Sequence, residues 1–365
     1  MKKRLAVLLL LFLCLHSWAG AEESYTIDQV RQQAAAGWRQ TYEAYGRNIV
    51  ADVEAVIPAV HQVPIERLTF ARTEPAVTEE ETGLTFIVRP EENVFAFATD
   101  DFIEIIPQQR DKKNDGCIGH PREWNRAYAQ GNSLTLQGTV DIIREALSVM
   151  RLDVDNWDLE HPYELATFRF FHPKTKEIAA PGEYMIYFHQ KVNGIPLLNH
   201  AGATFYQKTR GNATIRLNAS VIDRDMYDIS APMLKPIERI ADDVPLCGFS
   251  KIIEAAEREI LAGHIRKIYH LEFGYLFYED PDCVSSRTQT DHFYAVPAWQ
   301  LSCLYMSNPR KELPEYGQEE TGDARYSLEY ACLTIDAQTG EIRDFMSQKK
   351  DRALYHGFLS WEDVR

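Results

Sequence analysis

The sequence contains few combinations of residues that could carry out chemistry. Ser347 and Lys350 match the Ser-x-x-Lys motif of penicillin-recognising enzymes, but the companion Ser-Asp-Asn and Lys-Thr-Gly motifs are absent from the sequence. The short motifs of zinc proteases, serine hydrolases, phosphate-binding loops and dinucleotide-binding folds are missing as well. We therefore predict no catalytic residue, and we expect no bound cofactor.

Possible metal ligands are also poorly arranged. The acidic run 153–158 resembles a calcium loop, but Trp157 stands where an EF-hand needs an oxygen ligand and Asp158 where it needs glycine. A solvated turn is the favoured interpretation. The eleven histidines are scattered, and His264 and His270 have a spacing that fits no standard metal pair. The sequence therefore predicts no metal site.

Two further residues allow a functional and a structural interpretation. Asp336 could act as an acid or a ligand, but with Thr339 and Gly340 it forms an Asp-x-x-Thr-Gly pattern typical of a side chain that caps a turn. Trp299 could contact a partner, or it could fill the core between a sheet and a helix. In both cases the structural interpretation is favoured.

The N-terminus has the features of an export signal. A basic start is followed by the apolar run 6–15 and by an Ala-x-Ala site before Glu22, so we expect residues 1–21 to be removed. Cys14 could carry a lipid, but Leu13 precedes it where lipid attachment needs a small residue. We expect an extracellular or envelope-associated protein, without a transmembrane segment in the mature chain.

Charge and cysteine content narrow the class of partner. The net charge is −15, and removal of the signal takes away three positive charges. Such an acidic protein is not expected to bind nucleic acid or anionic lipid. Five cysteines remain after the signal, with no Cys-x-x-Cys pair. Cys303 and Cys332 fall on strands that we expect to be neighbours, so they form either a cross-strand disulfide or two small buried apolar side chains.

The elements that must position these residues suggest an α+β fold. A capping box at Thr26 predicts a helix that continues to Gly46. We expect residues 22–132 to form an N-terminal helix-strand segment that ends in a linker starting at Pro107. Within this linker, Trp124 and Tyr128 are expected to dock a short helix. Two units follow, at 133–232 and 233–365. Each begins with a helix that has one apolar stripe, followed by alternating strands, which predicts a helix packed on an antiparallel sheet. The stripe consists of Val140, Ile143, Leu147 and Met150 in the first unit, and of Ile252, Ala256 and Ile260 in the second, where Ser250 is the expected cap.

The strands and turns of these two units follow an order that is also found in a known family of domains. In the first, Tyr184-x-Ile-x-Phe and Asn193-Gly194-Ile195-Pro196 form a strand and a type I′ hairpin signal. In the second, Pro297-Ala298-Trp299 precedes the Asp336 turn. This order resembles PepSY-like and YycH/YycI-like extracytoplasmic domains. The whole chain also resembles an uncharacterised family of exported proteins from Gram-positive gut bacteria.

The resemblance implies a module that binds or regulates outside the membrane, and it supplies no catalytic residues. The expected partner is a protein, a peptide or an envelope polymer. The alternative is a secreted hydrolase that uses a pair of carboxylates. A pocket that holds two carboxylates, one of them with a strongly raised pKa, would favour the hydrolase.

Overall fold

The structure is a computed structural model of the whole chain. It describes residues 23–71, 76–89, 94–100, 109–110, 134–161, 164–171, 178–198, 205–207, 211–213, 216–231, 233–279, 292–306 and 328–347.

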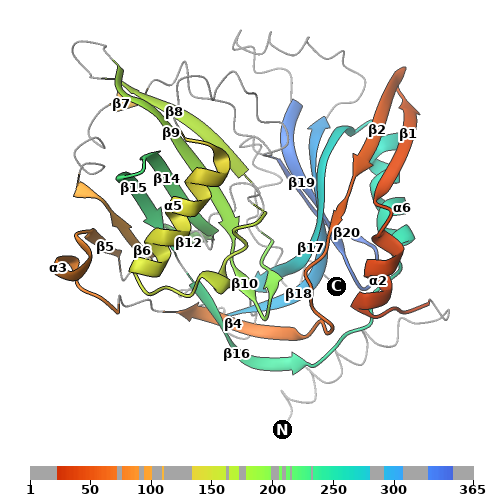
Figure 1. Cartoon of the computed structure of the whole chain (residues 1–365). Helices are drawn as coiled ribbons and strands as arrows, with labels where there is room; N and C mark the ends of the chain where they lie inside the picture. Colours follow the sequence, from red (N-terminus) through yellow and green to blue (C-terminus); the bar gives the residue numbers. More distant parts are fainter. Residues whose placement is uncertain are drawn as a thin grey trace.

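Two seven-stranded sheets form the body of the molecule, and helices pack on them (Figure 1). The strand pairs described in both sheets are antiparallel, apart from a short parallel pairing of β3 with β17. Helices with one apolar stripe cover the sheets, as the sequence predicts. The predicted α+β class is therefore confirmed.

The first sheet is covered by helix α5 (Leu136–Val149). The predicted stripe of Val140, Ile143, Leu147 and Met150 is buried against side chains of the sheet such as Phe188. In order across the sheet the strands are β5 (Thr85–Arg89), β6 (Val94–Ala98), β15 (Met226–Ser230), β14 (Arg216–Asp223), β9 (Ile178–His189), β8 (Glu164–Phe171) and β7 (Gln109–Arg110).

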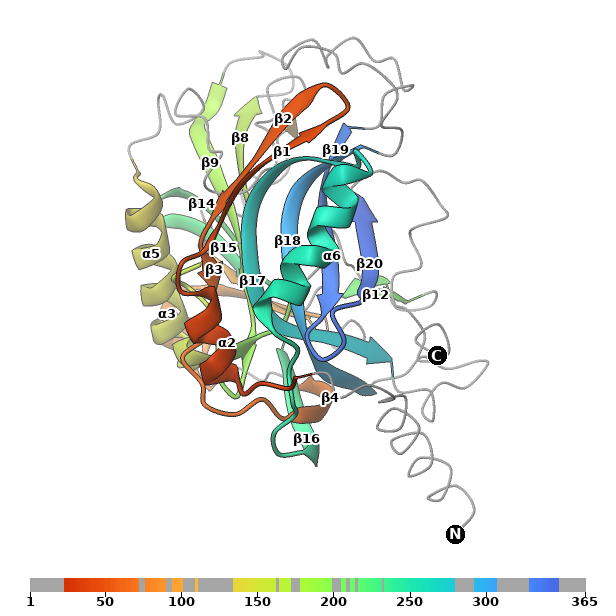
Figure 2. The same cartoon turned by 90° about the vertical axis from the view of Figure 1, so that its right-hand side faces the viewer.

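The second sheet is covered by helix α6 (Phe249–Leu261), which lies across β17, β18 and β19 (Figure 2). Its predicted stripe of Ile252, Ala256 and Ile260 is buried, although the helix is capped at Gly248 and not at Ser250. The strands are β16 (Met233–Ala241), β4 (Ile65–Ala71), β18 (His292–Met306), β17 (Ile265–Glu279) and β3 (Ala55–Val56), with β19 (Leu328–Asp336) beside β18 and β20 (Ile342–Ser347) beside β19.

Short elements complete the described chain. The 3-10 helix η3 and the helix α3 belong to the first sheet's side of the molecule, and the hairpin of β10 and β11 follows β9 directly. Their bounds, with those of a second small hairpin, are α3 (Glu79–Thr82), η3 (Val154–Asn156), β10 (Lys191–Val192), β11 (Ile195–Pro196), β12 (Phe205–Gln207) and β13 (Gly211–Ala213).

The predicted helix from Thr26 to Gly46 is wrong beyond its second turn. The capping box at Thr26 is present, but α2 spans only Ile27–Ala34 and is followed by Gly37 with a φ of 68°. The chain then forms the hairpin of β1 (Trp38–Ala44) and β2 (Arg47–Val53). The spacing of four between Trp38 and Tyr42 misled the prediction, because residues i and i+4 share a face on a strand as well as on a helix.

The predicted N-terminal segment 22–132 is not a separate unit. Its strands β3 and β4 belong to the second sheet, whereas β5, β6 and β7 belong to the first. The first sheet is thus built between residues 85 and 230, inside a second unit whose strands β4 and β16 flank it in sequence and pair with each other. The boundary near residue 232 is observed as the passage from β15 to β16, but the two units are nested and not consecutive.

In the described part of the chain, the helices are all too short or too polar to cross a membrane.

Candidate functional site: a buried polar seam between the two sheets

The predicted Asn193–Gly194 turn joins β10 to β11. Both residues have positive φ, 52° and 79°, as a type I′ turn requires. Pro196 is buried at the end of β11. The structural role predicted for this turn is confirmed. The turn also does more than the sequence predicted, because the Asn193 side chain reaches Glu66 on the second sheet, with 2.7 Å between Nδ2 and Oε1.

The Asp336 turn is also structural. Oδ1 of Asp336 accepts hydrogen bonds from the backbone N–H groups of Gln338 (2.8 Å) and Thr339 (2.9 Å), and Gly340 follows with a φ of 69°. Oδ2 accepts two hydrogen bonds of 3.1 Å from the guanidinium of Arg343. The carboxylate is therefore occupied by the turn and by an arginine, as the favoured interpretation predicts.

Trp299 belongs to the core and does not form a partner contact. Its side chain is 1% exposed, and its ring lies 5.4 Å from the rings of both Phe249 on α6 and Phe273 on β17. The structure thus contradicts the proposed partner contact at Trp299 and supports the favoured core position. The reason is that α6 covers this face of the second sheet.

Cys303 and Cys332 lie on neighbouring strands, as predicted, but one position out of register. Cys303 pairs with Ala331, and Ser302 pairs with Cys332. Cross-strand disulfides join residues that share a face, and adjacent positions along a strand alternate between faces, so this register does not favour the bridge. The side chain of Cys332 lies outside the described residues, and the disulfide stays a prediction.

The remaining sequence candidates that lie within the described residues give no reactive group. Asp153 caps η3 through a hydrogen bond from the backbone of Asp155, which agrees with a polar turn. Among the described residues, no group of three or more histidine, cysteine or acidic side chains could hold a metal ion. The predictions at Cys14, Trp124, Tyr128 and Lys350 concern residues outside the described part of the chain.

The most concentrated set of buried polar groups lies where the two sheets meet, and sequence reasoning missed it. We call this set the polar seam. Its buried members are His189 and Gln190 from the first sheet and Glu66, His270, Glu272 and Gln300 from the second. Two exposed residues, Asn193 and Arg239, complete it from the surface by contacting Glu66.

The centre of the polar seam is a carboxylate between two imidazoles. Nε2 of His189, at the end of β9, lies 3.2 Å from Oε1 of Glu272 on β17. Nε2 of His270 lies 3.5 Å from Oε2 of the same carboxylate. The amide of Gln300 donates to Oε1 over 3.3 Å. None of the four residues is more than 6% exposed, so the carboxylate is out of reach of a dissolved substrate.

The two imidazoles determine the charge state of Glu272. Burial alone would raise the pKa of this carboxyl, because an apolar surrounding disfavours the charged form. The attraction and hydrogen bonds of His189, together with those of His270, more than offset that effect and hold the pKa below its ordinary value. Glu272 is therefore an anion in the folded protein at neutral pH.

A second carboxylate of the polar seam is held in a similar way. Glu66 on β4 is 2% exposed. Its Oε1 accepts from Asn193 (2.7 Å) and from Nε of Arg239 on β16 (3.0 Å). An arginine and an amide thus satisfy this buried charge, as buried carboxylates require.

Backbone contacts lock the same junction. The side-chain amide of Gln190 donates to the carbonyl of Leu234 (2.5 Å) and accepts from its N–H (2.7 Å), so it replaces a strand partner. The N–H of Leu198 donates to the carbonyl of Tyr275 (2.7 Å). This approach requires Gly274, because a Cβ atom there would lie 2.7 Å from a methyl group of Leu198.

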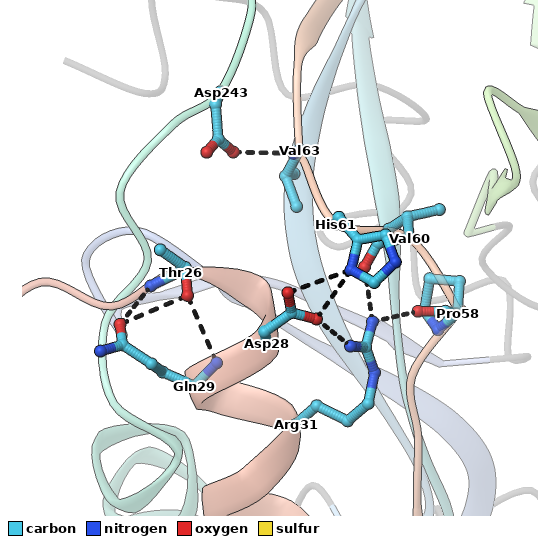
Figure 3. A network of polar contacts seen from close by, with 9 residues as sticks. All are labelled: Thr26, Asp28, Gln29, Arg31, Pro58, Val60, His61, Val63 and Asp243. Atoms are coloured by element: carbon cyan, nitrogen blue, oxygen red, sulfur yellow. Dashed lines mark hydrogen bonds and ion pairs between the residues drawn. The ribbon is translucent and has the colours of Figure 1, made fainter.

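A separate polar network lies at the surface, around α2 (Figure 3). Arg31 donates to the backbone carbonyls of Pro58 (2.7 Å) and Val60 (2.6 Å), and it also contacts Asp28. Oδ2 of Asp28 lies 3.0 Å from Nδ1 of His61. We call this set the α2 network. It fixes the chain between β3 and β4 on the helix.

One sequence signal for the polar seam was present. His270 and Glu272 alternate with Leu271 and Phe273 along β17, so one face of this strand is polar although the strand lies inside the sheet. A buried polar face must meet partners from another element. The partner on β9 is 83 residues away in sequence, and only the packing of the two sheets identifies it.

No protein-family model matches the chain, and no curated protein matches it. Among solved structures, the chain is similar to an uncharacterised protein from Eubacterium rectale ATCC 33656, with 9% sequence identity and a TM-score of 0.49. The match covers 88% of this chain and 98% of that chain. A likeness this distant carries no argument about function. The resemblance to PepSY-like domains therefore stays a prediction.

Proposed function

We propose that the protein is an exported, non-catalytic module that binds a protein, a peptide or an envelope polymer. The observation that carries this proposal is the state of the polar seam. The side chains of Glu272 and His189 are at most 1% exposed and contact each other between the two sheets. They contribute to the packing of the units, with no open face for a substrate.

The same observation counts against the hydrolase that uses a pair of carboxylates. Such an enzyme needs one carboxyl that stays protonated near neutral pH, and therefore a raised pKa. The pKa of Glu272 is lowered instead, by His189 and His270. Glu66, the other buried carboxylate of the polar seam, is engaged by Arg239.

The net charge of the protein restricts the class of partner that it can bind. A mature chain with more acidic than basic side chains repels anionic polymers and favours a neutral or basic surface. Binding to such a partner should be saturable, and added salt should weaken it if charge contributes.

Two measurements test the two parts of the proposal, export and binding without catalysis. The intact mass of the exported form should equal that of a chain that begins at Glu22. A diacylglycerol on Cys14 would contradict the expected processing. The purified mature chain should then show saturable retention on an envelope fraction, with the heat-unfolded chain as control. It should not turn over peptide, ester, glycan or phosphoester substrates.

Matched variants make the second measurement decisive. Glu66→Gln and Glu272→Gln keep the shape of the two buried carboxylates and remove their charge. A turnover that either variant abolishes, while circular dichroism shows the fold intact, would overturn the proposal and establish the hydrolase. Absence of saturable retention on peptidoglycan, protein and membrane fractions alike would contradict the binding function itself.

A further inference from the structure

The face of the second sheet that is turned away from α6 carries a row of buried polar side chains. Glu272 on β17 is the register partner of Gln300 on β18, which is in turn the partner of Thr334 on β19. Directly opposed residues of an antiparallel sheet project from the same face, so these three side chains are neighbours. The three residues are at most 1% exposed. Trp299, the next residue of β18, packs against α6 on the opposite face.

The carboxylate of Glu272 determines the orientation of the Gln300 amide. Nε2 of Gln300 lies 3.3 Å from Oε1 of Glu272. A carboxylate anion only accepts hydrogen bonds, so the amide must direct its NH₂ group toward Glu272. Its oxygen, Oε1, is therefore turned away from that carboxylate. This oxygen is an acceptor, and it needs a donor from another group.

Two atoms of the row lack a hydrogen-bond partner within the part of the chain that the structure describes. They are Oε1 of Gln300 and Oγ1 of Thr334, and both are buried. Buried polar atoms of folded proteins are nearly always satisfied, either by protein groups or by ordered water. Two such atoms on paired positions of one face indicate that a single small group satisfies both.

We propose that Gln300 and Thr334 hold one ordered water molecule on the buried face of the second sheet. The water donates a hydrogen bond to Oε1 of Gln300 and forms a second hydrogen bond with the hydroxyl of Thr334. Water is the smallest neutral molecule that can make both bonds, and buried waters in proteins occupy sites of this kind. The bound water extends the hydrogen-bonded row from Glu272 to Thr334 and thereby links β19 to the polar seam.

Replacement of the hydroxyl by a methyl group gives opposite results with and without the water. Thr334→Val keeps the shape of the side chain. If the water is present, the variant removes one of its two bonds and should lower Tm by about 2 °C or more. If no group bonds the hydroxyl, the variant removes an unsatisfied buried atom, and an unchanged or raised Tm would overturn the proposal.

Thr139→Val is the matched control. Thr139 on α5 is 0% exposed, as Thr334 is, but its hydroxyl donates to the carbonyl of Thr135 over 3.0 Å. The loss of Tm in this variant measures the loss of one ordinary buried hydroxyl bond. The loss at Thr334 should be of the same size.

A double-mutant cycle shows whether one group joins the two side chains. Gln300→Met removes the amide and keeps the length of the side chain. Thr334→Val should lower Tm less in the Gln300→Met background than in the wild type, because the shared water has already lost one anchor. Additive losses would show separate partners and would refute the bridging water. If Gln300→Met does not fold, Thr334→Val alone and the structure below still decide.

A crystal structure of the full mature chain, at a resolution that shows ordered water, identifies the group itself. One water should lie about 2.5–3.0 Å from both Oε1 of Gln300 and Oγ1 of Thr334. A protein side chain in that position, a direct hydrogen bond between Thr334 and Gln300, or no density beside the two atoms would each overturn the proposal.

Discussion

The polar seam and the α2 network contain the same chemical pair in opposite surroundings. His189 and Glu272 lie 3.2 Å apart with side chains that are 0% and 1% exposed, whereas His61 and Asp28 lie 3.0 Å apart with side chains that are 84% and 45% exposed. In both pairs the pKa of the carboxyl is lowered. Hydrogen bonds from His61 and Arg31 lower it at Asp28, while at Glu272 the histidines must first overcome the effect of burial.

The difference shows that distance alone does not measure the importance of an ion pair. Water can replace either partner of the exposed pair, so the fold hardly depends on it. No water replaces a missing partner inside the junction of two sheets, and the remaining charge is left buried. The following variants are chosen to test this contrast.

The largest effect is expected when one member of each pair is removed. His189→Ala should lower the free energy of unfolding by about 3–5 kcal/mol, because it leaves the buried Glu272 carboxylate without the imidazole that lies 3.2 Å from it. His61→Ala should give an unfolding curve that overlaps that of the wild type. Urea unfolding followed by circular dichroism measures both. Equal losses in the two variants would remove the contrast.

Two turn glycines should give the next largest effect. Gly194→Val and Gly340→Val place a β-branched side chain at positive φ, which should cost about 1–3 kcal/mol each without affecting a specific chemical step. At Gly340 a Cβ atom would also lie 2.7 Å from Cγ of Lys251. Thermal melts measure the loss, and unchanged midpoints would contradict the role of the turns.

The same two variants also distinguish a change near the polar seam from a change elsewhere in the second unit, through hydrogen exchange at Leu198. Gly194 precedes the junction directly, so Gly194→Val should also increase hydrogen exchange at Leu198. Gly340→Val should leave that exchange close to the wild-type value.

Acid should reduce the contribution of the buried Glu272 carboxylate to the free energy of unfolding. The folded pKa of Glu272 is lowered, so its stabilising contribution is present above the unfolded glutamate value of about 4.3 and is lost as the pH falls toward the folded value. The stability gap between the wild type and Glu272→Gln should therefore shrink by at most about 1.4 kcal/mol per pH unit below that point. For Asp28→Asn, the gap should stay small throughout. A gap for Glu272→Gln that widens in acid would contradict the lowered pKa.

The smallest measurable effect is expected within the α2 network. Arg31→Ala removes hydrogen bonds to the carbonyls of Pro58 and Val60 and should cost about 1 kcal/mol. Arg39→Ala is the matched control, because Arg39 is more exposed, its acidic partners Asp52 and Glu54 are exposed as well, and it donates to one backbone carbonyl, that of Ala36, where Arg31 donates to two. Chemical denaturation of the two variants in parallel checks the difference, and a larger loss for Arg39→Ala would contradict it.

Local patterns predicted much of this fold. The apolar stripes of α5 and α6, the capping box at Thr26 and the Asn193–Gly194 turn depend on neighbours in sequence, and the structure confirms them. The helix expected after Ala34 failed because a spacing of four residues suits a helix and a strand equally.

The polar seam could not be predicted in the same way. Its bonds join residues far apart in sequence: 83 positions separate His189 from Glu272, and 127 separate Glu66 from Asn193. A single polar residue in an apolar strand shows that a partner must exist, but the choice of partner depends on how two separate sheets pack. The nesting of the units was hidden for the same reason, because strand pairing across long intervals leaves no local pattern.

The pairing of β4 with β16 has a consequence for the order in which the chain can assemble. Ala71 and Met233 are register partners, so the first unit leaves and rejoins the second at neighbouring points. The chain is synthesised from its N-terminus, so more than 160 residues are made after β4 before its partner β16 is available. The strands of the enclosed unit are all complete by then. The enclosed unit can fold first, and by doing so it brings the ends of β4 and β16 together. Its completion thus shortens the loop that the outer sheet must close and lowers the entropy cost of that closure.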